Sequence, residues 1–167
     1  MAVAVPEPPL LDQDGKLLPQ TKDKPRTDDP LFDKHASMLF RAIVEDDPEL
    51  ARSFFFPIEA YEKVKGIAKP ARDWKHRLWA HFVRDVHDYH RKLGPDPDKA
   101  VLERIDVSGR PVRWMKPGSE GNRIGYYRVT HTRIRGRRGD GRRISLELTA
   151  MISWRGNWYV VHLNGFK

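Results

Sequence analysis

Four histidines occur in one stretch of the chain, "ARDWKHRLWAHFVRDVHDYHRKLG" (residues 71–94). The last two, His87 and His90, are three residues apart, a spacing that can place two zinc ligands on one face of a helix. A zinc site also needs a third ligand and typically a glutamate after the first histidine, and the motif HEXXH does not occur in the sequence. The alternative is a polar, solvated helix face. His81, Asp85 and Asp88 are four and three residues apart, so they share one face of the helix in this way. We predict no metal site and no cofactor.

The segment from residue 123 to residue 143 is dominated by arginine, and Asp140 is its only acidic residue. Six of its arginines lie toward the tip of an expected hairpin: Arg133, Arg135, Arg137, Arg138, Arg142 and Arg143. Near Tyr126 and Tyr127, such side chains could bind phosphates while the aromatic rings stack on bases. The alternative is a solubilising hairpin whose charges prevent edge-to-edge pairing of strands. Nucleic acid and acidic protein surfaces are therefore candidate partners.

The whole chain is basic, with 31 lysines and arginines against 23 aspartates and glutamates and a formal net charge of +8 at pH 7. This excess favours anionic partners, although arginines on a solvated surface would give the same charge. The absence of cysteine excludes disulfides, thiol nucleophiles and thiolate metal sites. The GxSxG nucleophile turn, the P-loop and the EF-hand loop do not occur either, so no common motif locates a site.

No apolar run approaches the roughly 18 to 20 residues that a membrane span needs, so we expect a soluble protein. The first residues, "MAVAVPEPPLLDQDGKLLPQ", lack the basic and apolar regions of a secretory signal. As written, the chain is expected in the cytoplasm. A periplasmic or secreted location follows if a signal peptide was removed.

Residues 1–27 contain five prolines among scattered charges and no repeating apolar face. This composition predicts a disordered tail or linker, unless a partner or the domain surface holds it. Residues 28–167 are long enough for a single domain with its own core.

The first part of this domain has the apolar spacing of helices. Asp28 or Asp29 can cap a helix that begins at Pro30 and carries an apolar stripe at three- and four-residue spacing. A short helix begins after Asp47-Pro48, and a proline kinks the apolar segment that follows, at position 57. A longer helix then covers about 22 residues and ends at Gly94.

Beyond Gly94 the apolar period changes from 3.6 to 2, which indicates strands. Five segments follow this pattern: 100–109, 111–116, 123–136, 142–154 and 157–166. Helices followed by an antiparallel meander predict an α+β fold, with the N-terminal helices packed on one face of a strongly curved, cone-like sheet.

The last two strands flank a turn at Arg155-Gly156 or Gly156-Asn157, and both choices are two-residue hairpin loops. A two-residue loop pairs residues of opposite parity, so Trp154 and Tyr159 share an almost wholly apolar face. The opposite, outer face would expose an apolar patch suited to a homodimer or another partner: Met151, Trp158, Val160 and His162.

The same rule applies to the preceding hairpin, where a two-residue turn can form at Gly139-Asp140 or Asp140-Gly141. It places Tyr127 and His131 on the apolar face that the helices cover. Tyr126, Arg128, Thr130 and Thr132 then point outward. A three-residue loop at either turn would exchange the faces.

Three amphipathic helices before a bent meander, closed by the hairpin "MISWRGNWYVVHL", resemble the nuclear transport factor two-like superfamily, the cystatin-like α+β cones. This superfamily includes ketosteroid isomerase and the polyketide cyclases of the SnoaL type. The resemblance covers about residues 28 to 167 and depends on the order of elements and the terminal hairpin.

The resemblance implies a cavity between helices and sheet, where enzymes of the superfamily place a carboxylate base, or a histidine and aspartate pair, with tyrosine donors. In this chain the implied ligand-binding residues are Trp114, Tyr127, His131, Trp154 and Tyr159, with Tyr61 and Trp79 as further candidates. An isomerase, dehydratase or cyclase would use His131 as the base, with Tyr127 or Tyr159 stabilising an oxyanion. The expected acid is missing, since Glu147 falls on the outer face and the side taken by Asp106 is not fixed.

These observations favour a non-catalytic binding or assembly module with a hydrophobic cavity for a small apolar ligand. The cavity enzyme remains an alternative that requires an open cavity with His131 pointing into it. A third alternative is an anion or nucleic-acid binder that uses the arginine-rich hairpin. Three consecutive aromatic residues could fill the cavity: Phe54, Phe55 and Phe56.

Overall fold

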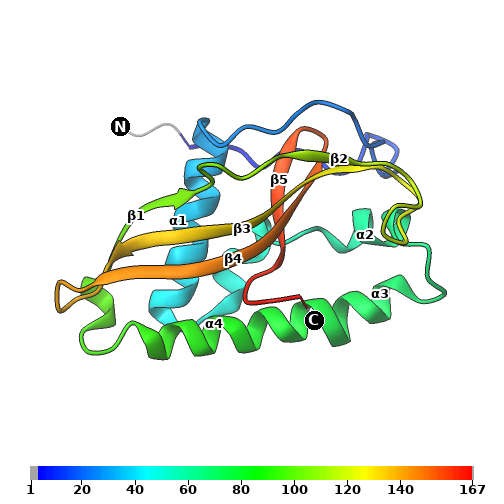
Figure 1. Cartoon of the computed structure of the whole chain (residues 1–167). Coiled ribbons are helices and arrows are strands. Elements are labelled where there is room, and N and C mark those ends of the chain that lie inside the picture. The colour runs from blue at the N-terminus through cyan, green and yellow to red at the C-terminus, as the bar shows by residue number, and fades with distance from the viewer. Residues whose placement is uncertain (1–3, 167) are drawn as a thin grey trace.

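The structure, a computed structural model, describes residues 4–166 of the chain. In this range, α-helices pack on an antiparallel sheet that does not close into a barrel, which confirms the α+β class (Figure 1). The helices are α1 (Pro30–Glu45), α2 (Ile58–Val64), α3 (Pro70–Asp73) and α4 (Ala80–Lys92). The strands are β1 (Val101–Asp106), β2 (Arg113–Met115), β3 (Tyr126–Arg137), β4 (Arg143–Trp154) and β5 (Asn157–His162). Within residues 4–166, no helix is long and apolar enough to cross a membrane.

Helix α1 begins where the capping residues predict. The Asp29 side chain accepts a hydrogen bond of 2.8 Å from the backbone amide of Phe32, and Pro30 occupies the first turn, where a missing N–H costs nothing. The helix ends at Asp46, which has left-handed backbone angles. Asp47 then caps the short 3-10 helix η1 (Pro48–Phe54), so two short polar side chains determine both helix starts.

The expected long helix exists, but a stretch near its beginning is not α-helical. A π-helical turn, η2 (Trp74–Trp79), connects α3 to α4 and adds an extra residue to the turn. The segment continues without a break to Lys92, and Gly94 follows with a φ of 68°. The wider turn lies beside the cleft described below, in keeping with the frequent occurrence of π turns at functional sites.

The sheet has the order β1-β3-β4-β5, and β2 pairs with β3 beside β1. All pairs are antiparallel. The turn between β4 and β5 is the expected two-residue loop, Arg155-Gly156, and both residues have positive φ. Ile152 therefore pairs with Tyr159, on the face that packs against the helices.

The loop between β3 and β4 differs from the expected one. The Arg138 amide donates to the Arg142 carbonyl oxygen at 2.7 Å, which leaves three residues, Gly139-Asp140-Gly141, in the loop. Residues of equal parity therefore face each other, as in the pair Ile134 and Leu146. The assignment of Tyr127 and His131 to the helix-covered face is wrong, and the even positions of β3 take that face instead.

The outer patch that was expected to bind a second subunit is not exposed. Met151 and Val160 are at most 1% exposed and Trp158 is 3% exposed, so the protein buries them itself. Trp158 lines a surface pocket together with residues 24–28, the β1–β2 connection and Val129. His162 leaves this face because a β-bulge in the β4–β5 pair brings it opposite Ala150.

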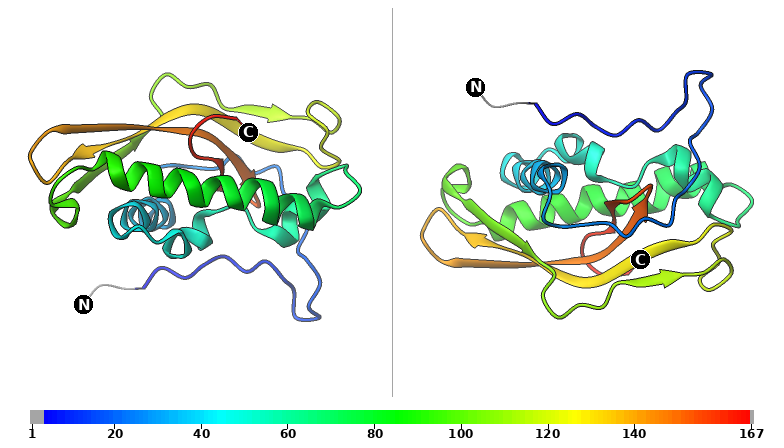
Figure 2. Two further views of the ribbon diagram at one scale, coloured as in Figure 1. Left: turned by 90° about the horizontal axis from the view of Figure 1, so that it is seen from below. Right: turned by 90° about the horizontal axis from the view of Figure 1, so that it is seen from above.

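Residues 4–27 run along the surface of the domain, which holds them through hydrogen bonds and ion pairs. Figure 2 shows the sheet and the helices as two layers, with the first part of the segment on the side of the helices that faces away from the sheet. There Glu7 pairs with Lys34 at 2.6 Å and with the buried His35 at 2.7 Å. Further along, Gln20 donates to the Ser153 carbonyl oxygen at 3.0 Å and accepts from the Arg155 amide at 2.7 Å.

Candidate functional site

The structure does not bring the expected ligand-binding residues together. Trp154 and Tyr159 lie in the core, where Phe56 packs edge-on against both rings at centroid distances of 6.2 and 6.1 Å. Tyr127 lies on the other face of the sheet, packed against Trp114 at 4.9 Å. The space expected as a cavity beside Trp154 is filled by Phe56, whose side chain is fully buried.

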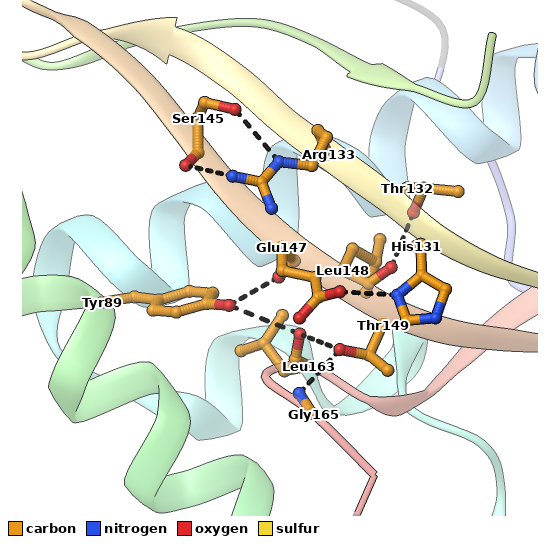
Figure 3. A network of polar contacts seen from close by, with 10 residues as sticks. All are labelled: Tyr89, His131, Thr132, Arg133, Ser145, Glu147, Leu148, Thr149, Leu163 and Gly165. Atoms are coloured by element: carbon orange, nitrogen blue, oxygen red, sulfur yellow. Dashed lines mark hydrogen bonds and ion pairs between the residues drawn. The ribbon is translucent and has the colours of Figure 1, made fainter.

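His131 lies on the solvent-facing side of β3 and its side chain is 51% exposed. Its Nδ1 atom is 2.7 Å from Glu147 Oε1, and the hydrogen bond from His131 lowers the pKa of that carboxyl group (Figure 3). His131 also has a φ of 57°, which only a few per cent of non-glycine residues adopt. A histidine with an orienting carboxylate is thus present, but it points away from the space between helices and sheet.

The polar groups around this pair hold the end of the chain to the sheet. Tyr89 donates to the Glu147 carbonyl oxygen at 2.6 Å, and Thr149 Oγ1 accepts from the Gly165 amide at 2.7 Å (Figure 3). Thr132 donates to the Leu148 carbonyl oxygen at 2.9 Å. These bonds connect α4, β3, β4 and the residues after β5, so their role is structural.

A cleft of 160 Å³ does exist between the helices and the sheet, at another place. Helix α2, the π turn, the β2–β3 loop and strands β3 to β5 supply its walls. Its apolar lining is Leu78, Ala150, Ile152, Val161 and Phe166. Its polar lining is Tyr61, Lys65, Arg77, Glu120, Tyr126, Arg128 and His162. The ring of Phe166 is more than half exposed, so the cleft reaches the surface beside it.

The local folding of three segments places the polar side chains. Tyr61 and Lys65 are four residues apart at the end of α2, and Tyr126 and Arg128 alternate along β3, so each pair shares a face. The β2–β3 loop is held by the buried Asn122 amide, which donates to three backbone carbonyl oxygens at 3.0 to 3.3 Å. The loop also pairs with the end of α2 through the backbones of residues 65 and 122, and this contact carries Glu120 to the cleft.

Asp73, just before the π turn, is neutralised by Arg77. Two guanidinium nitrogens of Arg77 lie 2.7 Å from the two carboxylate oxygens, and Tyr61 donates its hydroxyl proton to the same carboxylate. The hydrogen bonds from Arg77 hold the pKa of Asp73 below its usual value of 3.8. Burial and the bond to Asp73 raise the pKa of Tyr61, so its hydroxyl group stays protonated.

Glu120, on the wall of the cleft, is neutralised in the same way. Arg128 lies 2.5 Å from one carboxylate oxygen and the Tyr126 hydroxyl group donates to the other at 2.5 Å. Burial and this bond raise the pKa of Tyr126. Glu120, which lines the cleft, and Asp73, which binds the lining residues Tyr61 and Arg77, therefore each have an arginine and a tyrosine as partners.

Lys65 is different, because its ammonium group has no such partner. Among the residues from 4 to 166, none forms a hydrogen bond or an ion pair with its Nζ atom. The residue is half-buried in the lining of the cleft, and burial lowers its pKa below the usual 10.5. Glu120 and Asp73 attract the ammonium group electrostatically and offset part of the cost of its burial, but neither forms a hydrogen bond with it. The ammonium group can therefore still donate to an anion from outside the chain.

We expect Asp73→Asn to lower the free energy of unfolding by about 1 kcal/mol at pH 7, because the half-exposed ion pair with Arg77 is lost. The folded-state pKa of Asp73 is depressed, so its contribution is present above pH 3.8 and disappears as the pH falls through the lower folded value. Denaturant titrations of wild type, Asp73→Asn and the exposed control Asp98→Asn between pH 7 and acid check this. A deficit of Asp73→Asn that persists in acid would contradict it.

The arginines expected to bind anions fall into two groups. Arg133, Arg135, Arg137 and Arg143 lie on the solvent-facing side of the sheet. Arg138 and Arg142 are at the tip of the hairpin, where both pair with Asp140. Two histidines of the long helix bind groups of the segment around the end of α1: His87 pairs with Asp46, and His90 Nδ1 lies 2.9 Å from the Ile43 carbonyl oxygen. Within residues 4–166, no cluster of three metal-ligating side chains occurs.

Comparison of the chain with protein-family models, with curated proteins and with solved structures found no match. The site is therefore assigned from its own geometry.

Proposed function

We propose that this chain is a binding module for a small organic anion, a carboxylate joined to an apolar body of about the size of a benzene ring. The ligand occupies the cleft between α2, the π turn and the sheet. The observation that carries the proposal is the ammonium group of Lys65, which has no hydrogen bond within residues 4–166 while the carboxylates nearest to it, Glu120 and Asp73, already have arginine partners.

The dimensions and lining of the cleft support this ligand class. Its 160 Å³ is close to the roughly 150 Å³ cavity that binds benzene in an engineered protein. Leu78, Ile152 and Val161 offer an apolar contact surface for the body of the ligand. The tyrosine hydroxyl groups already donate to carboxylates, whereas the Lys65 ammonium makes no hydrogen bond within residues 4–166 and can donate to the ligand's own carboxylate.

We also propose a distant relation to the nuclear transport factor two-like superfamily. Two features support it: the order of helices and strands, and a cleft between the helices and the sheet. The residues that line this cleft are not those the resemblance implied, with the exception of Tyr61.

Calorimetric titration with benzoate and with its uncharged counterpart benzamide tests the function. Benzoate is expected to bind, and benzamide at least about tenfold more weakly, because a hydrogen bond to a charged group contributes about 1.5 to 3 kcal/mol. Benzoate affinity should fall as the pH rises toward 10.5, since Lys65 loses its proton below that value. Equal binding of the two compounds, or none by either, would contradict the proposal.

A further inference from the structure

A second surface of the molecule carries an excess of positive charge that the cleft does not use. We call it the arginine face; it lies on the solvent side of β1, β3 and β4 and consists of Arg104, Arg133, Arg135, Arg137 and Arg143. The three-residue loop of the β3–β4 hairpin creates it, because equal-parity pairing places Arg137 opposite Arg143 and the odd arginines of β3 on one side. Arg104 of β1 joins them opposite Arg135.

Acidic side chains balance only part of this charge. Asp106 binds Arg135 at 2.7 Å and lies 3.7 Å from Arg104. Arg133 donates to the Ser145 hydroxyl and carbonyl oxygens at 3.1 and 2.9 Å, and Glu147 lies directly opposite it in the β3–β4 register and balances part of its charge. Arg137 reaches only a backbone oxygen, and no carboxylate of residues 4–166 pairs with Arg143. Among the described residues, Arg137 and Arg143 therefore have no carboxylate partner, and five arginines face mainly Asp106 and Glu147.

Exposed aromatic rings continue the arginine face at the other end of β3. His131 follows Arg133 on the same side of the strand, and Phe166 lies edge-on to it at a centroid distance of 5.9 Å. Phe166 is 56% exposed and also contacts His162 at 5.4 Å. From His131 to Arg137, β3 extends over about 20 Å at roughly 3.4 Å per residue.

We propose that this surface binds single-stranded nucleic acid, with phosphates on the arginines and bases stacked on Phe166 and His131. Alternate residues of a strand repeat at about 6.8 Å, so the arginines form a row of evenly spaced cations beside the rings. Such a row with neighbouring aromatic platforms is how proteins bind single strands without reading sequence. A membrane is a poorer partner, because the hairpin tip Gly139-Asp140-Gly141 has no apolar side chain to insert and carries a carboxylate.

Fluorescence anisotropy tests the proposal with labelled RNA and DNA single strands of about 12 nucleotides, within the site sizes known for single-strand binders. The variant Arg133→Gln/Arg137→Gln/Arg143→Gln removes three positive charges from the arginine face and keeps the ion pair between Arg135 and Asp106 that connects β3 to β1. The matched control is Arg72→Gln/Lys75→Gln/Arg84→Gln, which removes equal charge from exposed positions on the helices.

For the wild type we expect affinity that falls steeply with salt, and for the control the same salt dependence. In the arginine-face variant, affinity should fall roughly tenfold and the slope of log K against log salt should decrease by about 2, since each single-strand phosphate contact contributes about 0.7. Phe166→Ala should weaken binding about fivefold or more through lost stacking. RNA and DNA should behave alike, because the bases are read only by stacking.

Three results would overturn the proposal. The first is equal loss of affinity in the arginine-face variant and in the control. The second is tighter binding of polyglutamate than of the oligonucleotides, which would assign the surface to acidic proteins. The third is tighter binding of phosphatidylserine vesicles, which would assign it to a membrane. Because Lys65 lies outside this surface, Lys65→Met should leave oligonucleotide binding unchanged.

Discussion

Lys65→Met is expected to weaken benzoate binding by about 10- to 100-fold, the equivalent of one hydrogen bond to a charged group. Methionine keeps a similar unbranched apolar stem and removes only the ammonium group that would meet the carboxylate. The matched control is Lys63→Met, an exposed residue of α2 that does not line the cleft. Calorimetric titration of wild type and both variants with benzoate and benzamide measures the effect.

The stability of the same variants shows whether Lys65 has a structural role. Its side chain is partly desolvated and makes no ion pair with another residue of the described range, so its removal should leave the free energy of unfolding unchanged or raise it slightly. A variant that loses benzoate affinity but not stability identifies a ligand contact. Unchanged benzoate affinity in Lys65→Met would remove the main support for the anion site.

Phe56→Ala is expected to lower the free energy of unfolding by about 3 to 5 kcal/mol, the usual cost of deleting a buried phenylalanine ring. The ring is fully buried, packs against Trp154 and Tyr159, and belongs to a residue whose amide donates to the Val160 carbonyl oxygen at 2.9 Å. Denaturant titration measures the loss, with the exposed Phe166→Ala as control, for which we expect a change of about 0.5 kcal/mol.

The free energy of unfolding of Phe56→Ala distinguishes between two structures: a packed centre between helices and sheet, and the open cavity that an enzyme using His131 needs. If the space between Trp154 and Tyr159 were open, the ring of Phe56 would have few neighbours and its removal would cost little. A loss below about 1 kcal/mol would therefore contradict the packing described here. Tyr159 provides a second readout: burial raises its pKa to about 12, and in Phe56→Ala water that enters the space should bring the pKa back toward 10.

The elements of the fold could be predicted because local signals specify them. Asp29-Pro30 and Asp47-Pro48 start helices through capping bonds that involve neighbouring residues, and Arg155-Gly156 allows only a tight turn. The strands follow from a change of apolar period that needs no knowledge of the tertiary structure. These features are sufficient to predict the α+β class from the sequence.

The site could not be predicted because it depends on a single loop length. Gly139-Asp140-Gly141 fits a two-residue or a three-residue loop, and the choice decides whether Tyr126 or Tyr127 faces the helices. Nothing local favours the three-residue form: the closing bond between Arg138 and Arg142 is seen only in the folded hairpin. A three-residue loop assumed at this turn would have assigned Tyr126 and Arg128 to the face of the sheet that lines the cleft.

The other polar residues of the cleft are positioned by contacts between segments that are far apart in the sequence, or by local structure that the sequence pattern does not reveal. Glu120 is positioned by a loop that pairs with the end of α2, and Arg77 by a π turn that apolar periodicity does not reveal. Lys65 has no sequence signal of its own, because an unpaired lysine is recognised only once its neighbours are known. The surroundings of Trp158 are similar, since residues 24–28, far away in the sequence, line a pocket together with it.

The most direct test of the central claim is to locate bound benzoate in solution by nuclear Overhauser effects between its ring protons and the methyl groups of the protein. The anion site predicts contacts to Leu78, Ile152 and Val161, and a change in the Lys65 side-chain signals on binding. Contacts to methyl groups elsewhere, or binding that leaves Lys65 unaffected, would contradict the assignment of this cleft.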